Sequence, residues 1–172
     1  MERVFTQTYA ACGAIIERDG KILLVHENLP GSPDDGKWSH PAGWIEVGDD
    51  PLETVRKEVS EETGFEFEPT GLLGIYSIVR LNLAAFWGAT PHGIKLIFIG
   101  KIGEYSEKNL LGDTRGTQWF KPEEIFAMDQ KTLRDVDIKQ MVRDYFSGKR
   151  YPLEIITHTI MEDSKNCQMG LK

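Results

Sequence analysis

Three glutamates, Glu58, Glu61 and Glu62, are spaced so that an α-helix would place them along one edge. On a wheel of 100° per residue they fall within about 100° of one another. Carboxylates at i, i+3 and i+4 repel one another, and the helix dipole disfavours negative charge toward the carboxyl end of a helix. An arrangement that is unfavourable by itself suggests a bound cation, and hard oxygen ligands select magnesium, manganese or calcium over zinc. The alternative is a Glu-rich helix face that is simply solvated.

Clear start and stop signals predict the helix that carries these acids, over residues 51–63. Asp50 can cap its amino terminus, and Glu53 three positions later completes a capping box. Pro51 fits the first helical position, and Gly64 suits the left-handed conformation that ends many helices. The buried stripe of this helix is expected at Leu52, Val55 and Val59.

The rest of the chain mixes strand and helix signals, which indicates an α/β domain with helices packed on a sheet. Asp19-Gly20 is a strong hairpin turn between two of the predicted strands. Strands are predicted at 8–17, 21–26, 71–80, 93–101 and 117–120, a helical turn at 122–127, and loops at 29–36 and 81–92. An amphipathic helix is predicted at 132–146, with Val136, Ile138, Met141, Val142 and Tyr145 toward the core.

Length and charge narrow the functional classes. The 172 residues favour a single domain over 1–172, with a core at about 8–156 and a polar tail at 157–172. The formal net charge of −7 disfavours binding to a nucleic acid polymer. No apolar run approaches the roughly 18–20 residues of a bilayer crossing, and no secretory signal is evident, so we expect no membrane partner and a cytoplasmic location.

The two cysteines and the four histidines give no catalytic or metal pattern of their own. Cys12 and Cys167 are far apart and lack metal-ligand spacing, so neither a disulfide framework nor a zinc site is favoured. We interpret Cys12 as a small buried apolar residue and Cys167 as part of the tail. No spacing among the histidines suggests a catalytic dyad.

The acidic helix and the residues before it resemble the signature box of the Nudix hydrolases. That box reads Gly-x5-Glu-x7-Arg-Glu-U-x-Glu-Glu-x-Gly-U, where U is a bulky apolar residue. Here Gly43 and Asp49 are followed, after seven residues, by Lys57-Glu58-Val59-Ser60-Glu61-Glu62-Thr63-Gly64-Phe65. Asp49 stands where the family has Glu, and Lys57 stands where it has Arg. Because Lys lacks the planar fork of Arg, the contact that orients the carboxylates is expected to be looser.

Two further segments are similar to the NudJ-type phosphatases within that family. They are Trp38-Ser39-His40-Pro41-Ala42-Gly43, before the box, and the segment 147–154 near the carboxyl end. Together the similarities span about residues 8–156. The fold that this resemblance implies is an α/β/α sandwich around a central mixed sheet, which is compatible with the order of predicted elements.

The resemblance implies Mg²⁺, with Mn²⁺ as an alternative, held by Glu58, Glu61, Glu62 and the backbone carbonyl of Gly43 or its neighbour. It also implies that Glu58 is the base that takes a proton from the attacking water. Glu58, Glu61 and Lys57 are therefore the predicted catalytic residues. A loop acid, Asp113 or Glu104, is the alternative base.

Other polar and aromatic residues are open to two interpretations. Asp49 either supports Lys57 and the helix or is a plain loop acid, and Glu46 either joins the metal pocket or lies on the surface. Arg80 and Lys95 are candidates for phosphate contact, although most exposed basic residues are only solvated. The candidates for stacking on a substrate ring are Trp87 above all, and Tyr9, Phe86 and Trp119.

The leading hypothesis is a magnesium-dependent hydrolase of phosphoric anhydride bonds that acts on a small diphosphate substrate. That substrate is a nucleoside di- or triphosphate or the diphosphate of a thiamine precursor. An ADP-ribose or nucleotide-sugar pyrophosphatase is the alternative within the family, and the aromatic loop 81–91 is the feature that decides between them. A nucleotide-sensing module without activity is the non-enzyme alternative. The oligomeric state stays open, with a homodimer among the alternatives.

Overall fold

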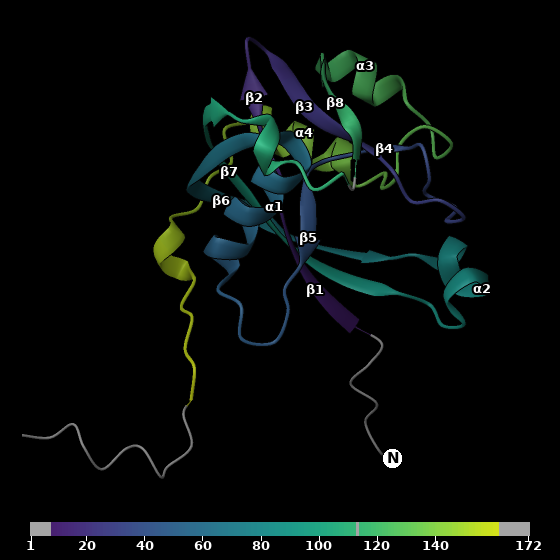
Figure 1. Cartoon of the computed structure of the whole chain (residues 1–172), viewed down its shortest axis with the longest axis horizontal. Helices are drawn as coiled ribbons and strands as arrows, with labels where there is room; N and C mark the ends of the chain where they lie inside the picture. The colour runs from purple at the N-terminus through teal and green to yellow at the C-terminus, as the bar shows by residue number, and fades with distance from the viewer. Residues whose placement is uncertain (1–7, 113, 162–172) are drawn as a thin grey trace, which may run out of the picture.

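Two four-stranded sheets form the framework of the computed structural model, which describes residues 8–112 and 114–161 (Figure 1). The larger sheet is mixed, because β1 pairs in parallel with β7 and antiparallel with β5. Its strand order is β5 (Ala42–Trp44), β1 (Thr8–Ile15), β7 (His92–Tyr105) and β6 (Phe65–Val79). The smaller sheet pairs β3 (Lys21–Glu27) with β2 (Glu17–Arg18), β4 (Trp38–Ser39) and β8 (Thr114–Phe120).

Helix α1 (Pro51–Thr63) has the bounds that its capping signals predicted. The Asp50 carboxylate accepts a hydrogen bond from the amide of Leu52 at 2.8 Å, and Gly64 ends the helix at a φ of 76°. One detail is wrong: Glu53 does not complete a capping box, because its carboxylate accepts from Arg56 at 2.7 Å on the exposed side. Val55 and Val59 are fully buried, as predicted, and anchor α1 to one face of the larger sheet.

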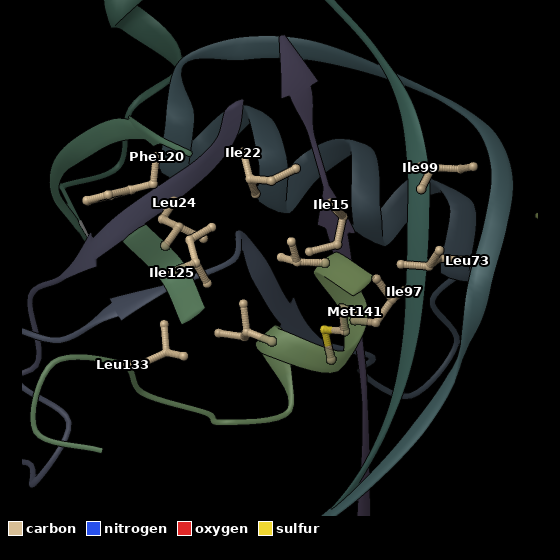
Figure 2. Packing of buried hydrophobic residues seen from close by; sticks show 12 residues of the cluster. Ile15, Ile22, Leu24, Leu73, Ile97, Ile99, Phe120, Ile125, Leu133 and Met141 are labelled. Atoms are coloured by element: carbon tan, nitrogen blue, oxygen red, sulfur yellow. The ribbon is translucent and has the colours of Figure 1, made fainter. Parts of the chain in front are cut away.

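Helix α4 (Ile138–Phe146) packs on the opposite face through Ile138, Met141 and Val142 (Figure 2). Neighbouring residues of β7 alternate between the two cores, since Ile97 and Ile99 face α4 whereas Phe98 faces α1. This arrangement confirms the expected α/β/α sandwich with a central mixed sheet. Cys12 is fully buried in the core beneath α1, as predicted, whereas Cys167 lies outside the described residues.

The predicted helix at 132–146 is too long at its amino end. The backbone of residues 132–134 instead pairs with Trp38, which donates to the carbonyl of Thr132 at 2.8 Å and accepts from the amide of Arg134 at 2.9 Å. Those backbone groups are therefore not available for the helix. Val136, predicted to face the core, is 44% exposed as a result.

The other elements differ mainly in length from the predicted ones. Strands β6 and β7 extend beyond their predicted bounds, and Pro69 is tolerated because β6 is an edge strand with a register shift at that point. The predicted loop 81–92 contains a 3-10 turn (Leu81–Leu83) and α2 (Ala84–Trp87), at the tip of the β6–β7 hairpin (Figure 1). The remaining elements are α3 (Pro122–Ala127), as predicted, and 3-10 turns at Glu107–Asn109 and Leu153–Ile155.

The carboxyl-terminal segment is fixed to the sheet by a short backbone pairing. Tyr151 donates to the carbonyl of Leu72 at 2.8 Å, and the amide of Leu72 donates back at 2.9 Å. Among the described helices, none has the length and apolar character needed to cross a membrane.

Candidate active site

The acidic edge of α1 faces strand β5 across a cleft of about 300 Å³. Gly43, in the middle of β5, lies directly against the carboxylate of Glu58, and a Cβ at position 43 would overlap that carboxylate. The absence of a side chain at Gly43 therefore makes room for the acid. The cleft is lined by Glu27, Leu29, Ala42, Gly43, Trp44, Glu46, Asp49, Lys57, Glu58, Glu62 and Arg134.

Glu62 is crowded by other carboxylates in this cleft. Its carboxylate accepts a hydrogen bond from the amide of Ala42 at 2.9 Å, which ties α1 to the residue before Gly43. Desolvation raises the pKa of Glu62 well above its ordinary value, and the charges of Glu27 and Glu58 raise it further. The cleft thus concentrates negative charge in a setting where a cation would be stabilising.

Lys57 lies between the other two predicted metal ligands, Glu58 and Glu61. Its ammonium nitrogen lies 3.8 Å from a carboxylate oxygen of Glu58 and 3.8 Å from one of Glu61. The Lys57 side chain is 64% exposed, so these ion pairs are loose and weak on their own. The arrangement is compatible with the expected orienting role of Lys57.

The residues fit a divalent cation by their chemistry, although the cluster is not assembled. Carboxylates and a backbone carbonyl are the ligands that Mg²⁺ prefers, and Glu58, Glu62 and Gly43 line one cleft. Within residues 8–112 and 114–161, no three acidic, histidine or cysteine side chains are grouped closely enough to hold a metal ion. Glu61 is linked to the cleft through Lys57.

The wall of this cleft contains an ion pair that no sequence motif indicates. The guanidinium of Arg134 donates to the carboxylate of Glu27 at 2.6 Å, and Glu27 is 4% exposed. Although burial alone would lower it, the pKa of Arg134 is raised by the charges of Glu27 and Asp135. Neither residue has a motif that marks it, because the pair joins positions 107 residues apart.

A second cavity, of about 50 Å³, adjoins the acidic cleft. The two share Ala42, Gly43, Trp44 and Arg134 in their walls. All three residues predicted to bind substrate, Arg80, Lys95 and Trp87, line this cavity. Its other lining residues are Tyr9, Ala11, Ser39, His40, Leu83 and Asp135.

Arg80 and Lys95 are buried and engaged by aspartates rather than exposed. Arg80 donates two hydrogen bonds to Asp34, both at 2.8 Å, and lies 3.1 Å from Asp135. Lys95 bridges Asp135 at 2.9 Å and Asp137 at 2.8 Å. Their positive charge is thus largely balanced inside the protein.

His40 is the other buried polar group of this cavity. It is 2% exposed, and neither ring nitrogen has a hydrogen-bond partner among the described residues. Burial lowers the pKa of His40 to about 3, so the ring is neutral at physiological pH. Apart from the position of His40 in the Trp-x-x-Pro-Ala-Gly segment, no sequence pattern indicated that it is buried in the wall of this cavity.

The remaining predicted residues lie in more peripheral places. Asp49 accepts from the amide of Glu46 at 3.1 Å in an exposed turn, and both line the cleft. Glu104 lies on the exposed end of β7, while Asp113, the other loop acid, falls outside the described residues. Phe86 is 54% exposed, and the ring of Trp119 lies under the guanidinium of Arg18. Neither ring lines the second cavity, which we call the aromatic cavity because Tyr9, Trp44 and Trp87 are in its wall.

Known proteins are similar to this chain over most of its length. A model of the NUDIX domain matches residues 6–145. Phosphatase NudJ of Escherichia coli strain K12 is 25% identical over 149 residues, which cover 86% of this chain and 90% of that protein. The solved structure of a NUDIX hydrolase from Nitrosomonas europaea is 33% identical, covers 88% of this chain and 97% of its own, and has a TM-score of 0.76. An ADP-ribose pyrophosphatase from Streptococcus suis shares the fold, with 22% identity, coverage of 83% and 95%, and a TM-score of 0.54.

Proposed function

The chain belongs to the Nudix family of hydrolases, which act on phosphoric anhydride bonds, and from this premise we propose that it is a magnesium-dependent hydrolase of a small nucleotide-type diphosphate. The substrate classes are a nucleoside di- or triphosphate and the diphosphate of a thiamine precursor. The similarity to Phosphatase NudJ supports this choice over other members of the family.

One observation carries the proposal: the acidic cleft opens beside an aromatic cavity, and the two share Gly43 and Arg134. A diphosphate in the cleft would place its organic group in the cavity. The acids and the organic-group site are therefore arranged for a substrate that has charge at one end and a ring at the other.

Glu58, Glu61, Glu62 and the Gly43 carbonyl would hold Mg²⁺ or Mn²⁺. When bound, such an ion neutralises phosphate oxygens and lowers the pKa of a bound water. Glu58 takes a proton from the attacking water, with Asp113 or Glu104 as the alternative base. Lys57 orients Glu58 and Glu61, which it approaches to 3.8 Å.

Arg134 is the residue that we add to the predicted set. It stands where the cleft meets the cavity, so its guanidinium is placed to donate to a phosphoryl oxygen. Contact of Arg80 and Lys95 with the substrate stays a prediction. Their position in the cavity wall favours contact, whereas their aspartate partners favour a role in shaping that wall.

The test is hydrolysis of a panel of diphosphates by the purified chain, with magnesium and then with a chelator. We expect magnesium-dependent release of inorganic phosphate from nucleoside di- or triphosphates or from the thiamine-precursor diphosphate. Release of AMP and a sugar phosphate from ADP-ribose would instead favour the pyrophosphatase alternative. If every compound stays intact while nucleotides still bind, the chain is a sensor and the proposal is wrong.

A further inference from the structure

Asp34, in the loop between β3 and β4, is a buried carboxylate with three cationic neighbours. Arg80 donates a hydrogen bond to each of its two oxygens, both at 2.8 Å. The ammonium of Lys37 donates to Oδ1 at 3.2 Å, and Nε of Arg134 lies 3.6 Å from Oδ2. Asp34 and Arg80 are only 2% and 5% exposed, so their contact is shielded from solvent. A bidentate pair of this kind fixes the relative orientation of its two side chains.

The Asp34–Arg80 pair holds Arg134 at two points. The carboxylate of Asp34 is a neighbour of the guanidinium, and Nη2 of Arg80 donates to the backbone carbonyl of Arg134 at 3.3 Å. Glu27 makes a third contact, since it accepts from Nη1 of Arg134 at 2.6 Å. These anchors come from the end of β3, the loop that follows it and the residue after β6. Because Nη1 and Nε lie near carboxylates, Nη2 is left as the donor for a ligand.

Asp34 affects a ligand only through its neighbours. Among the described residues that line the acidic cleft and the aromatic cavity, Arg134 belongs to both walls and Asp34 to neither. Buried ion pairs give little net stability compared with apolar side chains of the same volume. What this pair supplies to the site is a fixed Arg134. An arginine side chain that is ordered before the ligand arrives loses less entropy on binding.

We propose that Asp34 and Arg80 are positioning residues, which hold the guanidinium of Arg134 in the orientation that receives a phosphoryl group of the substrate. In this arrangement Arg80 affects the substrate through Arg134 and not by direct contact. The inference rests on the proposed function, because that function assigns the phosphoryl contact to Arg134.

A double-mutant cycle separates positioning from support of the fold. Asp34→Asn keeps the size of the side chain but removes its charge, and it is made in the wild type and in the Glu27→Met, Arg134→Met variant. With magnesium and the diphosphate that is hydrolysed best, we expect kcat/KM to fall about tenfold in the wild type, mainly through KM. Without Arg134 the further fall is less than about twofold, because the side chain that Asp34 positions is gone. Urea unfolding should show a similar loss of stability in both backgrounds, since Arg80 and Lys37 lose a charged partner in each.

Asp144→Asn is the matched control for the loss of a hydrogen-bonded carboxylate. Asp144 lies on α4 and accepts from Tyr76 at 2.7 Å and from Gln140 at 2.9 Å, and it is not among the residues that line the cleft or the cavity. We expect this variant to lose stability and to keep wild-type kcat/KM.

Arg80→Lys runs the same cycle if Asp34→Asn does not fold. Lysine keeps the charge beside Asp34, but it lacks the planar fork that reaches both Asp34 and the carbonyl of Arg134. We expect kcat/KM to fall about threefold in the wild type and to stay unchanged in the variant without Arg134.

Binding of methylenediphosphonate, a pyrophosphate analogue that is not hydrolysed, tests the cycle without turnover. Calorimetry with magnesium should show about tenfold weaker binding by Asp34→Asn, again only where Arg134 is present. Equal losses with and without Arg134, or no loss in folded Asp34→Asn, overturn the inference and not the proposed function. Absence of hydrolysis of every diphosphate, with the binding cycle as expected, overturns the proposed function alone. A wild type that neither hydrolyses a diphosphate nor binds the analogue overturns both.

Discussion

The guanidinium of Arg134 lies 2.6 Å from the carboxylate of Glu27, and Arg134 lines both the acidic cleft and the small cavity beside it. Without Arg134, the carboxylate of Glu27 would be an uncompensated charge next to Glu62. The pKa of Glu62 is raised mainly by desolvation and further by the charge of Glu27. Arg134 therefore balances a buried acid, and its place in both walls is the basis of its proposed contact with a phosphoryl group.

Replacement of Arg134 by alanine should affect both stability and turnover. Loss of one partner of a largely buried ion pair costs about 3–5 kcal/mol of unfolding free energy. The double variant Arg134→Met with Glu27→Met removes both charges and should recover most of that loss. Its kcat/KM should stay at least tenfold below wild type, because the phosphate donor is still missing. Urea unfolding and steady-state kinetics measure the two effects, and a double variant with full activity would exclude Arg134 from substrate binding.

Glu58→Gln and Glu61→Gln should lower turnover by about 10²–10⁴-fold, since they remove a proposed proton acceptor and proposed metal ligands. Unfolding free energy should change little, because neither side chain belongs to either hydrophobic core. Glu53→Gln is the matched control, on the exposed side of the same helix, and should keep full activity. Near-full activity in either test variant, measured with saturating magnesium, would remove that glutamate from the site.

The acidic edge could be predicted from the sequence because it is local. Asp50 and Gly64 set the ends of α1 through contacts within a few residues, and helical periodicity alone places Glu58, Glu61 and Glu62 along one edge of this helix. Gly43 was implied by family resemblance. Its physical reason, the close packing of the Glu58 carboxylate, became visible only when β5 was placed beside α1.

The other half of the site depends on contacts between distant segments. The pairing of Glu27 with Arg134 depends on the non-helical segment 132–137. Apolar periodicity predicted a helix there, but the backbone of this segment pairs with Trp38 instead. His40 has an ordinary sequence context, and only the packing of β1 shows that it is buried. Arg80 and Lys95 were predicted as phosphate contacts, with solvated surface bases as the alternative. The aspartates that pair with them in the buried site lie about 40 residues or more away in sequence.

Gly43→Ala should disturb the acidic cleft while the fold survives. The added methyl group would overlap the Glu58 carboxylate, which is the far end of a flexible side chain and can move aside. Displacement of a catalytic group by about 1 Å can cost about 10²-fold in rate. We therefore expect turnover to fall by 10- to 100-fold, while thermal unfolding in chelator shifts only slightly. If Gly43→Ala retains wild-type turnover, the position of Glu58 seen here is not the one used in catalysis.

His40 should make the protein less stable in mild acid. Burial lowers its pKa to about 3 in the folded state, whereas an unfolded chain protonates histidine near 6.5. Between these values the unfolded state binds one more proton, so stability is retained above about pH 6.5 and is lost as pH falls toward 3. The slope from this one group is about 1.4 kcal/mol per pH unit.

Urea unfolding from pH 6 to pH 4 should therefore show a shallower pH dependence for His40→Gln than for wild type, because glutamine does not titrate. His158→Gln, at an exposed position, should match the wild-type slope and so separates burial from histidine content. Equal slopes for wild type and His40→Gln would mean that His40 is protonated in the folded protein, contrary to a neutral ring in the cavity wall.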